Sequence, residues 1–276
     1  MGIIDDFLKT VTNLAPLKDG VQKKVFTGIH KDYGKVILKY GNFQSNTSLE
    51  RIKREINFLK ANISKYYPKN YDFLVDSISN TFLIMEEFID SISFIELQRQ
   101  IKDEVVAIKV FVSIIKALNL IWEKSIVHRD LKPDNILFKK DLSPIIIDLG
   151  IARFLKEDSL TNTLAYMGPC TPIFASPEQL LNKKNIIDQR TDFFALGILL
   201  SIIAFDRHPF DPSLIGNSNS IPENIVAGIH IDFKLIAKAS SELSFLLNKL
   251  LEKEPFMRFR DYSQIIKYIN ENWRII

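Results

Sequence analysis

The feature that most constrains this chain is a run of polar side chains set between two apolar segments. Residues 126–135 read Ile-Val-His-Arg-Asp-Leu-Lys-Pro-Asp-Asn, which places the carboxylate of Asp130, the ammonium of Lys132 and the carboxamide of Asn135 within six residues. The apolar run 145–147, typical of a buried strand, ends at a second carboxylate, Asp148. Such groups can accept a proton, neutralise a phosphate and ligate a hard cation. We therefore expect a fold that brings these two loops together.

Length and composition limit the classes of protein that this chain can form. Its 276 residues are 46% hydrophobic and 25% charged, which suffices for one large domain or two lobes, each with its own core. The formal charge of +3, from 36 basic and 33 acidic residues, gives no reason to expect a nucleic acid or a membrane as partner. The apolar run 193–205 is too short to span a bilayer and predicts a buried helix.

The termini and the cysteine content predict a location. Cys170 is the only cysteine, so an intrachain disulfide is excluded, and a reducing compartment is favoured. Asp5 and Asp6 stand where a secretory signal would carry basic residues. We expect a cytoplasmic protein, and the sequence predicts nothing about its oligomeric state.

Hydrophobic periodicity predicts a β-rich part followed by a mainly helical part. In the first ninety residues we expect a hairpin of strands 24–28 and 34–40, a helix over 49–61, and strands 71–77 and 81–89. Thereafter we expect a helix over 103–122 capped by Asp103, short strands 136–138 and 144–147, and helices near 176–181, 191–205, 240–251 and 262–270. The prediction is an α+β fold of two lobes, with a ligand site in the cleft between them.

The two loops resemble those of eukaryotic-type (Hanks-type) serine/threonine protein kinases, whose catalytic loop reads H-R-D-L-x-x-x-N and whose metal loop reads D-F-G. The resemblance covers about residues 17–269. It implies an N-terminal extension over 1–16 and a bilobal kinase domain over 17–276, with a small lobe to about 86, a hinge over 86–90 and a large lobe from 91. It further implies ATP and Mg²⁺, or Mn²⁺, as cofactors and Ser/Thr hydroxyls of proteins as substrates.

The resemblance assigns the catalytic roles. Asp130 is expected to accept the proton of the substrate hydroxyl, and Lys132 to neutralise the transferring phosphoryl group. Asn135 and Asp148 are expected to ligate Mg²⁺. In the family, a lysine at the position of Lys132 accompanies serine/threonine specificity.

The nucleotide-binding residues follow from the same resemblance. Val36-Ile37-Leu38-Lys39 resembles the family's V-A-I-K strand, so Lys39 is expected on the α- and β-phosphates and Glu55 is expected to hold it in the active state. The alternative is that Glu55 is an ordinary surface charge. It stays open because the same predicted helix carries a second glutamate, Glu50. The adenine site is predicted from five residues: Met85 as gatekeeper, Glu86 and Phe88 through backbone groups, and Val25 and Leu137 on the two sides of the ring.

A substrate platform and its supports are also expected. Thr171 resembles the threonine of G-T-P-x-Y and is predicted to hydrogen-bond Asp130 and Lys132. Glu178, in a segment resembling A-P-E, is predicted to form a buried ion pair with Arg258. Asp192 matches the family carboxylate that holds the catalytic-loop backbone.

A phosphorylation switch is a further hypothesis. Arg51, Arg129 and Arg153 could converge on one phosphate, and the loop before Ser176 offers Ser159, Thr161 and Thr163. We expect activation by phosphorylation of Thr161 or Thr163. The alternative is that these arginines are solvated or pair with the acidic residues at 157 and 158.

The sequence departs from the family at the nucleotide. Lys18, Gly20 and Lys23 stand where three glycines are expected, and Ile37 replaces the alanine of the adenine pocket. A weakened ATP site is predicted. The competing functions are a pseudokinase that binds without turnover and, ranked last, a small-molecule phosphotransferase of related fold. The latter lacks the Thr171 platform and the Arg258 partner that this chain carries.

Overall fold

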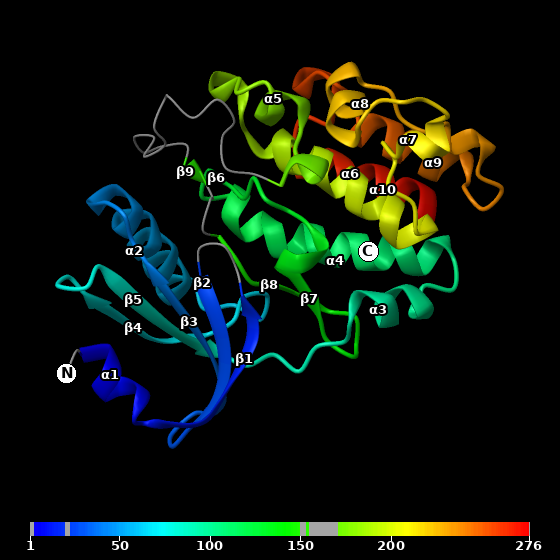
Figure 1. Ribbon diagram of the computed structural model, residues 1–276. Coiled ribbons are helices and arrows are strands. Elements are labelled where there is room, and N and C mark those ends of the chain that lie inside the picture. The colour runs from blue at the N-terminus through cyan, green and yellow to red at the C-terminus, as the bar shows by residue number, and fades with distance from the viewer. Residues whose placement is uncertain (1–2, 20–22, 150–152, 155–170, 276) are drawn as a thin grey trace. The chain divides into compact units, whose positions relative to one another are not determined.

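A computed structural model describes residues 3–19, 23–149, 153–154 and 171–275. The chain divides into two compact units, Met1–Asp90 and Ser91–Ile276 (Figure 1). Together they form the predicted α+β class, with an antiparallel sheet in the first unit and a helical second unit.

The first unit is built on one five-stranded antiparallel sheet with strand order β1-β2-β3-β5-β4. Its elements are α1 (Ile3–Leu8), β1 (Val11–Asp19), β2 (Lys23–His30), β3 (Gly34–Asn42), α2 (Asn46–Ala61), β4 (Asn70–Asp76) and β5 (Thr81–Glu87). The predicted hairpin of β2 and β3 is present, and its turn ends at Gly34, whose φ of 67° suits a residue without a side chain. Helix α2 begins three residues earlier than predicted because Ser45 caps it with Ser48.

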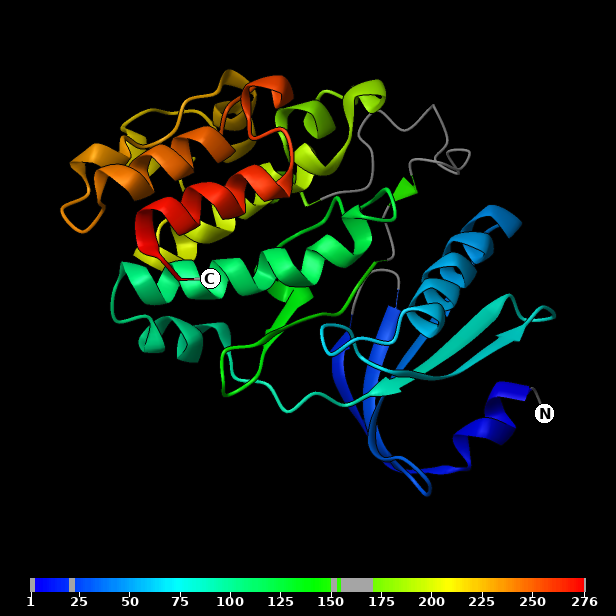
Figure 2. The same cartoon turned by 180° about the vertical axis from the view of Figure 1, so that it is seen from behind.

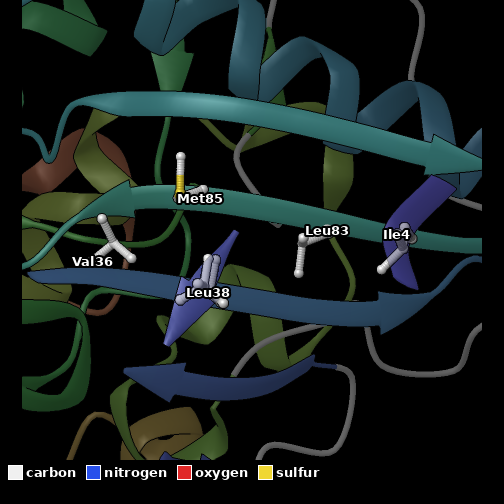
Figure 3. Packing of buried hydrophobic residues seen from close by; sticks show 6 residues of the cluster. Ile4, Val36, Leu38, Leu83 and Met85 are labelled. Carbon is white, nitrogen blue, oxygen red and sulfur yellow. The ribbon is translucent and has the colours of Figure 1, made fainter. Parts of the chain in front are cut away.

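The two faces of this sheet carry different side chains. On one face Val36, Leu38, Leu83 and Met85 form a buried cluster with Ile4 and Val11 (Figure 3). On the other face Phe82 and Ile84 form a second cluster with Phe43 and with Leu49 and Ile56 of α2. Alternation along each strand separates the two sets, so the register of β3 against β5 decides which polar residues share the α2 face.

Residues 3–19 form part of the sheet unit. Helix α1 buries Ile4 in the first cluster, and β1 pairs with β2 across two register shifts. The boundary predicted at residue 17 therefore falls inside β1. The strand escaped prediction because most of its side chains are exposed and Pro16 interrupts its pattern.

The second unit is mainly helical. Its helices are α3 (Phe94–Gln100), α4 (Glu104–Trp122), α5 (Pro177–Leu180), α6 (Gln189–Phe205), α7 (Pro212–Ile215), α8 (Ile221–Ala227), α9 (Ser241–Leu250) and α10 (Tyr262–Trp273). Its strands are β6 (Ile126–Val127), β7 (Ile136–Phe138), β8 (Pro144–Ile146) and β9 (Arg153–Phe154), in the pairs β6-β9 and β7-β8. Short 3-10 turns are η1 (Pro133–Asn135), η2 (Pro172–Phe174), η3 (Lys184–Ile186), η4 (Phe233–Leu235) and η5 (Pro255–Met257).

Helix α4 is the centre of the second unit. Asp103 caps it as predicted by accepting a hydrogen bond from the Val106 amide at 2.9 Å. The helix packs against α6 and α10, as Figures 1 and 2 show from opposite sides. It is the one described helix that is long and apolar enough to cross a membrane, but 61% of the apolar stretch is buried within the protein. Buried core helices have the same length and composition, so this finding is weak evidence for a span.

Candidate active site

The loop between β6 and η1 carries the polar run found in the sequence. Two buried residues anchor the loop: Val127 immediately before it and Leu131 near its other end. Between them, Arg129 has a φ of 72°, in the left-handed region that a residue with a side chain rarely adopts. Such a conformation persists when surrounding contacts hold it.

Asp192 supplies one of those contacts and also holds the neighbouring residue of the loop. From the first turn of α6 its carboxylate accepts hydrogen bonds from the backbone amides of His128 and Arg129, each at 2.9 Å, and from the indole of Trp122 at 2.8 Å. The contact predicted between this residue and the loop backbone is present. Gln179 Nε2 donates to the carbonyl of Arg129 at 2.7 Å. No pattern in the sequence singled out Gln179, which also completes the capping box of α5.

Burial shifts the pKa values of two residues at the catalytic loop, His128 and Asp192. It lowers the pKa of His128, an effect that the neighbouring carboxylates of Asp192, Asp148 and Asp130 only partly oppose. In this neutral ring Nδ1 accepts a hydrogen bond from the backbone amide of Asp130 at 3.3 Å. The ring proton is therefore on Nε2. Burial also raises the pKa of Asp192, while the hydrogen bonds from the loop and Trp122 favour its carboxylate form.

Asp130 is the hub of a polar cluster. Its Oδ2 accepts hydrogen bonds from Lys132 Nζ at 2.7 Å and Asn135 Nδ2 at 3.1 Å. Its Oδ1 accepts from the amide and the hydroxyl of Thr171, at 3.1 and 2.7 Å. Lys132 Nζ also donates to Thr171 Oγ1 at 2.6 Å. The predicted contacts of Thr171 with Asp130 and Lys132 are thus both present, and a hydroxyl sits between a carboxylate and an ammonium.

Asn135 and Asp148 lie on neighbouring segments of the second unit. The amide of Ile147, the residue before Asp148, donates to the carbonyl of Asn135 at 3.1 Å. The carboxamide nitrogen of Asn135 is used by Asp130, so its oxygen is the atom that it can offer to a cation. Among the residues that the structure describes, no group of three or more His, Cys, Asp or Glu is placed to hold a metal. One carboxylate and one amide oxygen nevertheless fit Mg²⁺, which takes few protein ligands and completes its shell with phosphates and water.

Glu178 and Arg258 form the predicted buried pair. Arg258 donates to both oxygens of Glu178, at 2.7 and 2.9 Å, and their side chains are 0% and 1% exposed. The same guanidinium donates to the carbonyls of Arg190, Glu252 and Lys253. This pair ties the segment after Thr171 to the turn η5.

The first unit contributes two buried ion pairs. Lys39 Nζ lies 2.7 Å from Glu86 Oε2, and Lys23 Nζ lies 3.8 Å from Glu55 Oε2. Glu55 is therefore a buried residue of α2 and not a surface charge. Glu86 was predicted to act through its backbone, but its carboxylate is what contacts Lys39. The Lys39–Glu55 pair expected in the active state stays a prediction.

The prediction of Met85 as gatekeeper is wrong. Its side chain lies in the cluster with Val36, Leu38 and Ile4 (Figure 3). The strand register puts this cluster on the face of the sheet opposite Lys39. Glu86, one residue later, occupies the face of Lys39, because Lys39 pairs with Ile84 and strand side chains alternate. Its backbone lies inside the ladder between Ile37 and Asn70.

The other predicted adenine residues are distributed over both units. Val25 and Ile37 are half-buried on the face of Lys39. The ring of Phe88 follows β5 and lies 3.7 Å below the ammonium of Lys35. Leu137 is half-buried in β7 of the second unit. Its contact with adenine opposite Val25 stays a prediction.

The proposed phosphorylation switch is described only in part. Arg51 is half-buried on α2, where burial lowers its pKa, and Arg129 is buried in the second unit. The backbone of Arg153 pairs with Val127. The other residues named for the switch and the glycine loop lie outside the described residues: Gly20, Ser159, Thr161 and Thr163. Convergence of the arginines stays a prediction.

Comparison with known proteins defines the class. Residues 13–271 match the protein kinase domain, so the chain belongs to that family. It is 36% identical to Serine/threonine-protein kinase ppk34 of Schizosaccharomyces pombe over 54% of this chain and 40% of that protein. It is 31% identical to Probable serine/threonine-protein kinase fhkA of Dictyostelium discoideum over 93% of this chain and 49% of that protein. It is 28% identical to the Carbon catabolite-derepressing protein kinase of Candida glabrata over 88% of this chain and 38% of that protein. The chain thus spans less than half the length of each of these relatives.

Proposed function

We propose that this chain transfers the γ-phosphoryl group of ATP to serine or threonine hydroxyls of protein substrates. The observation that carries the proposal is the cluster around Asp130, in which the Thr171 hydroxyl donates to the carboxylate at 2.7 Å and accepts from Lys132 at 2.6 Å. Membership of the protein kinase family and the names of the similar kinases support the same reaction.

Each residue of the cluster has a chemical task. Asp130 accepts the proton of the attacking hydroxyl and orients it in line with the phosphorus. The Thr171 hydroxyl donates to that carboxylate at 2.7 Å, which supports Asp130 as an acceptor for the hydroxyl of an alcohol. Lys132 neutralises charge on the transferring group. Little covalent chemistry is required of the protein, because positioning and charge stabilisation provide most of the acceleration.

The cofactors are ATP and Mg²⁺, or Mn²⁺ in its place. Asn135 and Asp148 would hold the metal through oxygen atoms, and the metal would neutralise charge on the phosphates. Lys39 would contact the α- and β-phosphates. Asp192 and Gln179 act on the reaction indirectly, because they hold the backbone of Arg129 and hence the position of Asp130.

Regulation and location complete the proposal. Phosphorylation of Thr161 or Thr163 would activate the enzyme if Arg51, Arg129 and Arg153 gather on the added phosphate, as three arginines can. Mass spectrometry of the fully active enzyme with neither threonine modified would end this part of the proposal. A single cysteine among 276 residues supports a cytoplasmic location.

The test compares two carboxylate-to-amide variants. Purified chain is incubated with γ-labelled ATP, Mg²⁺ and generic protein substrates, and the labelled amino acids are identified after hydrolysis. We expect label on serine or threonine, and its loss in Asp130→Asn. Asp141→Asn is the matched control, because Asp141 is an exposed carboxylate in the turn between β7 and β8.

Two results would contradict the proposal. Equal labelling by wild type and Asp130→Asn would remove Asp130 from the reaction. No labelling by wild type, with Mg²⁺ and ATP together still raising its melting temperature, would instead establish a nucleotide-binding pseudokinase.

A further inference from the structure

The first unit holds four charged side chains in an arrangement that the family resemblance did not predict. Lys23 comes from β2, Lys39 from β3, Glu86 from β5 and Glu55 from α2. All four side chains are largely withdrawn from water, with exposures of 16%, 10%, 4% and 4% in that order. Two cations therefore face two carboxylates inside the unit.

Strand register explains why these groups meet. Val25 of β2 is paired with Lys39, and Lys23 is two residues from Val25, so the two lysines are diagonal neighbours on one face of the sheet. Ile37 of β3 is paired with Glu86, which places Glu86 on the same face, diagonal to Lys39 on its other side. Helix α2 covers this face through Ile56 and brings Glu55 with it.

Charge balance connects the two pairs. A buried lysine is costly unless a carboxylate compensates it. Lys23 stands where the family carries a glycine, and it adds one buried positive charge near Glu55. With Glu55 alone, two lysines would share one carboxylate. Glu86 brings the second negative charge, at 2.7 Å from Lys39.

We propose that Glu86 is a positioning residue for Lys39, and that Lys23 and Glu86 compensate each other. In this arrangement a carboxylate from the neighbouring strand of its own sheet contacts Lys39, so one anchor of Lys39 does not lie on α2. Glu55 of α2 pairs with Lys23. The inference rests on the proposed function, because Lys39 is taken to contact the phosphates of ATP.

The proposal predicts a separation of binding from turnover. In Glu86→Gln the phosphates no longer compete with a carboxylate for Lys39, so Mg²⁺·ATP binds at least as tightly as to wild type. Lys39 is then less well aimed, so kcat falls about tenfold. A defect in folding alone would weaken nucleotide binding and would not give this pattern. Glu86→Asp keeps the charge and should recover part of kcat.

The sharpest test is a double-mutant cycle. Lys23→Met removes the extra cation, so the double variant Lys23→Met/Glu86→Gln keeps one lysine, Lys39, and one carboxylate, Glu55. We expect kcat of the double variant to lie several-fold above that of Glu86→Gln, a coupling within the range seen for groups of one ion-pair network. Lys24→Met combined with Glu86→Gln is the matched control, because Lys24 is the exposed neighbour of Lys23. It should give no recovery.

Two measurements on each variant make the outcomes distinct: the dissociation constant of Mg²⁺·ATP by calorimetry and the rate of phosphoryl transfer. Unchanged kcat in Glu86→Gln, or effects of Lys23→Met and Glu86→Gln that simply multiply, would overturn the inference while the proposed function stands. Absence of turnover in every variant, with nucleotide binding coupled through Lys23 and Glu86, would overturn the proposed function and leave the charge compensation supported. Circular dichroism tests whether each variant is folded. If Glu86→Gln is not folded, the double variant Lys23→Met/Glu86→Gln, whose buried charges balance, takes its place in the comparison with wild type.

Discussion

Replacing Arg258 by methionine should be among the most destabilising changes in the second unit. All five guanidinium N–H donors are used, two on the Glu178 carboxylate and three on backbone carbonyls. Methionine keeps much of the side-chain volume but strands the Glu178 carboxylate, which is 1% exposed. Among the described residues, the carboxylate then keeps the hydrogen bond from Thr191.

Removing one partner of such a buried pair costs about 3–5 kcal/mol. This is a large part of the roughly 5–15 kcal/mol that stabilises a typical protein. It corresponds to a folding equilibrium constant lower by about two to four powers of ten. We expect the urea midpoint to fall steeply at unchanged slope, as measured by circular dichroism.

Two further variants test the reasoning. Arg260→Met removes an exposed arginine two residues away and should change stability by less than about 0.5 kcal/mol. Arg258→Met combined with Glu178→Leu removes the stranded charge and should be more stable than Arg258→Met alone. The reasoning is refuted if Arg258→Met loses less than about 1 kcal/mol, or if the second substitution only adds to the damage.

Three other predictions concern the catalytic loop and its surroundings. Thr171→Val loses the hydroxyl between Asp130 and Lys132 and should lower kcat about tenfold or more. Thr171→Ser keeps a hydroxyl and should retain most of the wild-type kcat. Steady-state assays of the two variants test this difference. Asp192→Asn replaces one acceptor oxygen by a donor, so a buried loop amide loses its hydrogen-bond partner. We expect the free energy of unfolding, measured by urea denaturation, to fall by about 1–3 kcal/mol. An unchanged urea midpoint would contradict the role given to Asp192. Burial lowers the pKa of His208 below its ordinary 6.5, and its ring accepts from the Phe210 amide and donates to the Ile173 carbonyl as a neutral group. The unfolded chain therefore binds more protons as the pH falls through about 6.5, so the melting temperature should drop between about pH 7.5 and 5.5, and less so in His208→Gln; an equal drop in both proteins would contradict this.

Local patterns in the sequence were enough to predict the catalytic loop. Residues 128–135 form one continuous segment, so the order of Asp130, Lys132 and Asn135 already fixes which groups are neighbours. The pairs with Thr171 and between Glu178 and Arg258 were predicted from the family resemblance, and both are present. Helix α4 was predicted because its apolar period and its cap at Asp103 are both local features.

Contacts set by strand register were not predictable in the same way. The order Met85-Glu86 matched a family pattern, but the face on which each side chain lies depends on the pairing of Lys39 with Ile84 across two strands. A shift of one residue exchanges the two faces, which is why Met85 was expected on the face of Lys39 and the carboxylate of Glu86 was not. The sequence likewise contains many carboxylates but does not tell which one reaches Lys39. Gln179 was missed because its partner, the carbonyl of Arg129, is a backbone atom 50 residues away.

The central claim is that Asp130 acts on a substrate hydroxyl during phosphoryl transfer, and a single-turnover experiment tests it most directly. Wild type and Asp130→Asn, each in excess over γ-labelled ATP and at a concentration above its dissociation constant, are loaded with the nucleotide and Mg²⁺ and mixed with excess protein substrate. We predict that both bind the nucleotide with similar dissociation constants and that the transfer step of Asp130→Asn is slower by about 10²-fold or more. Equal transfer rates in the two proteins would contradict the claim.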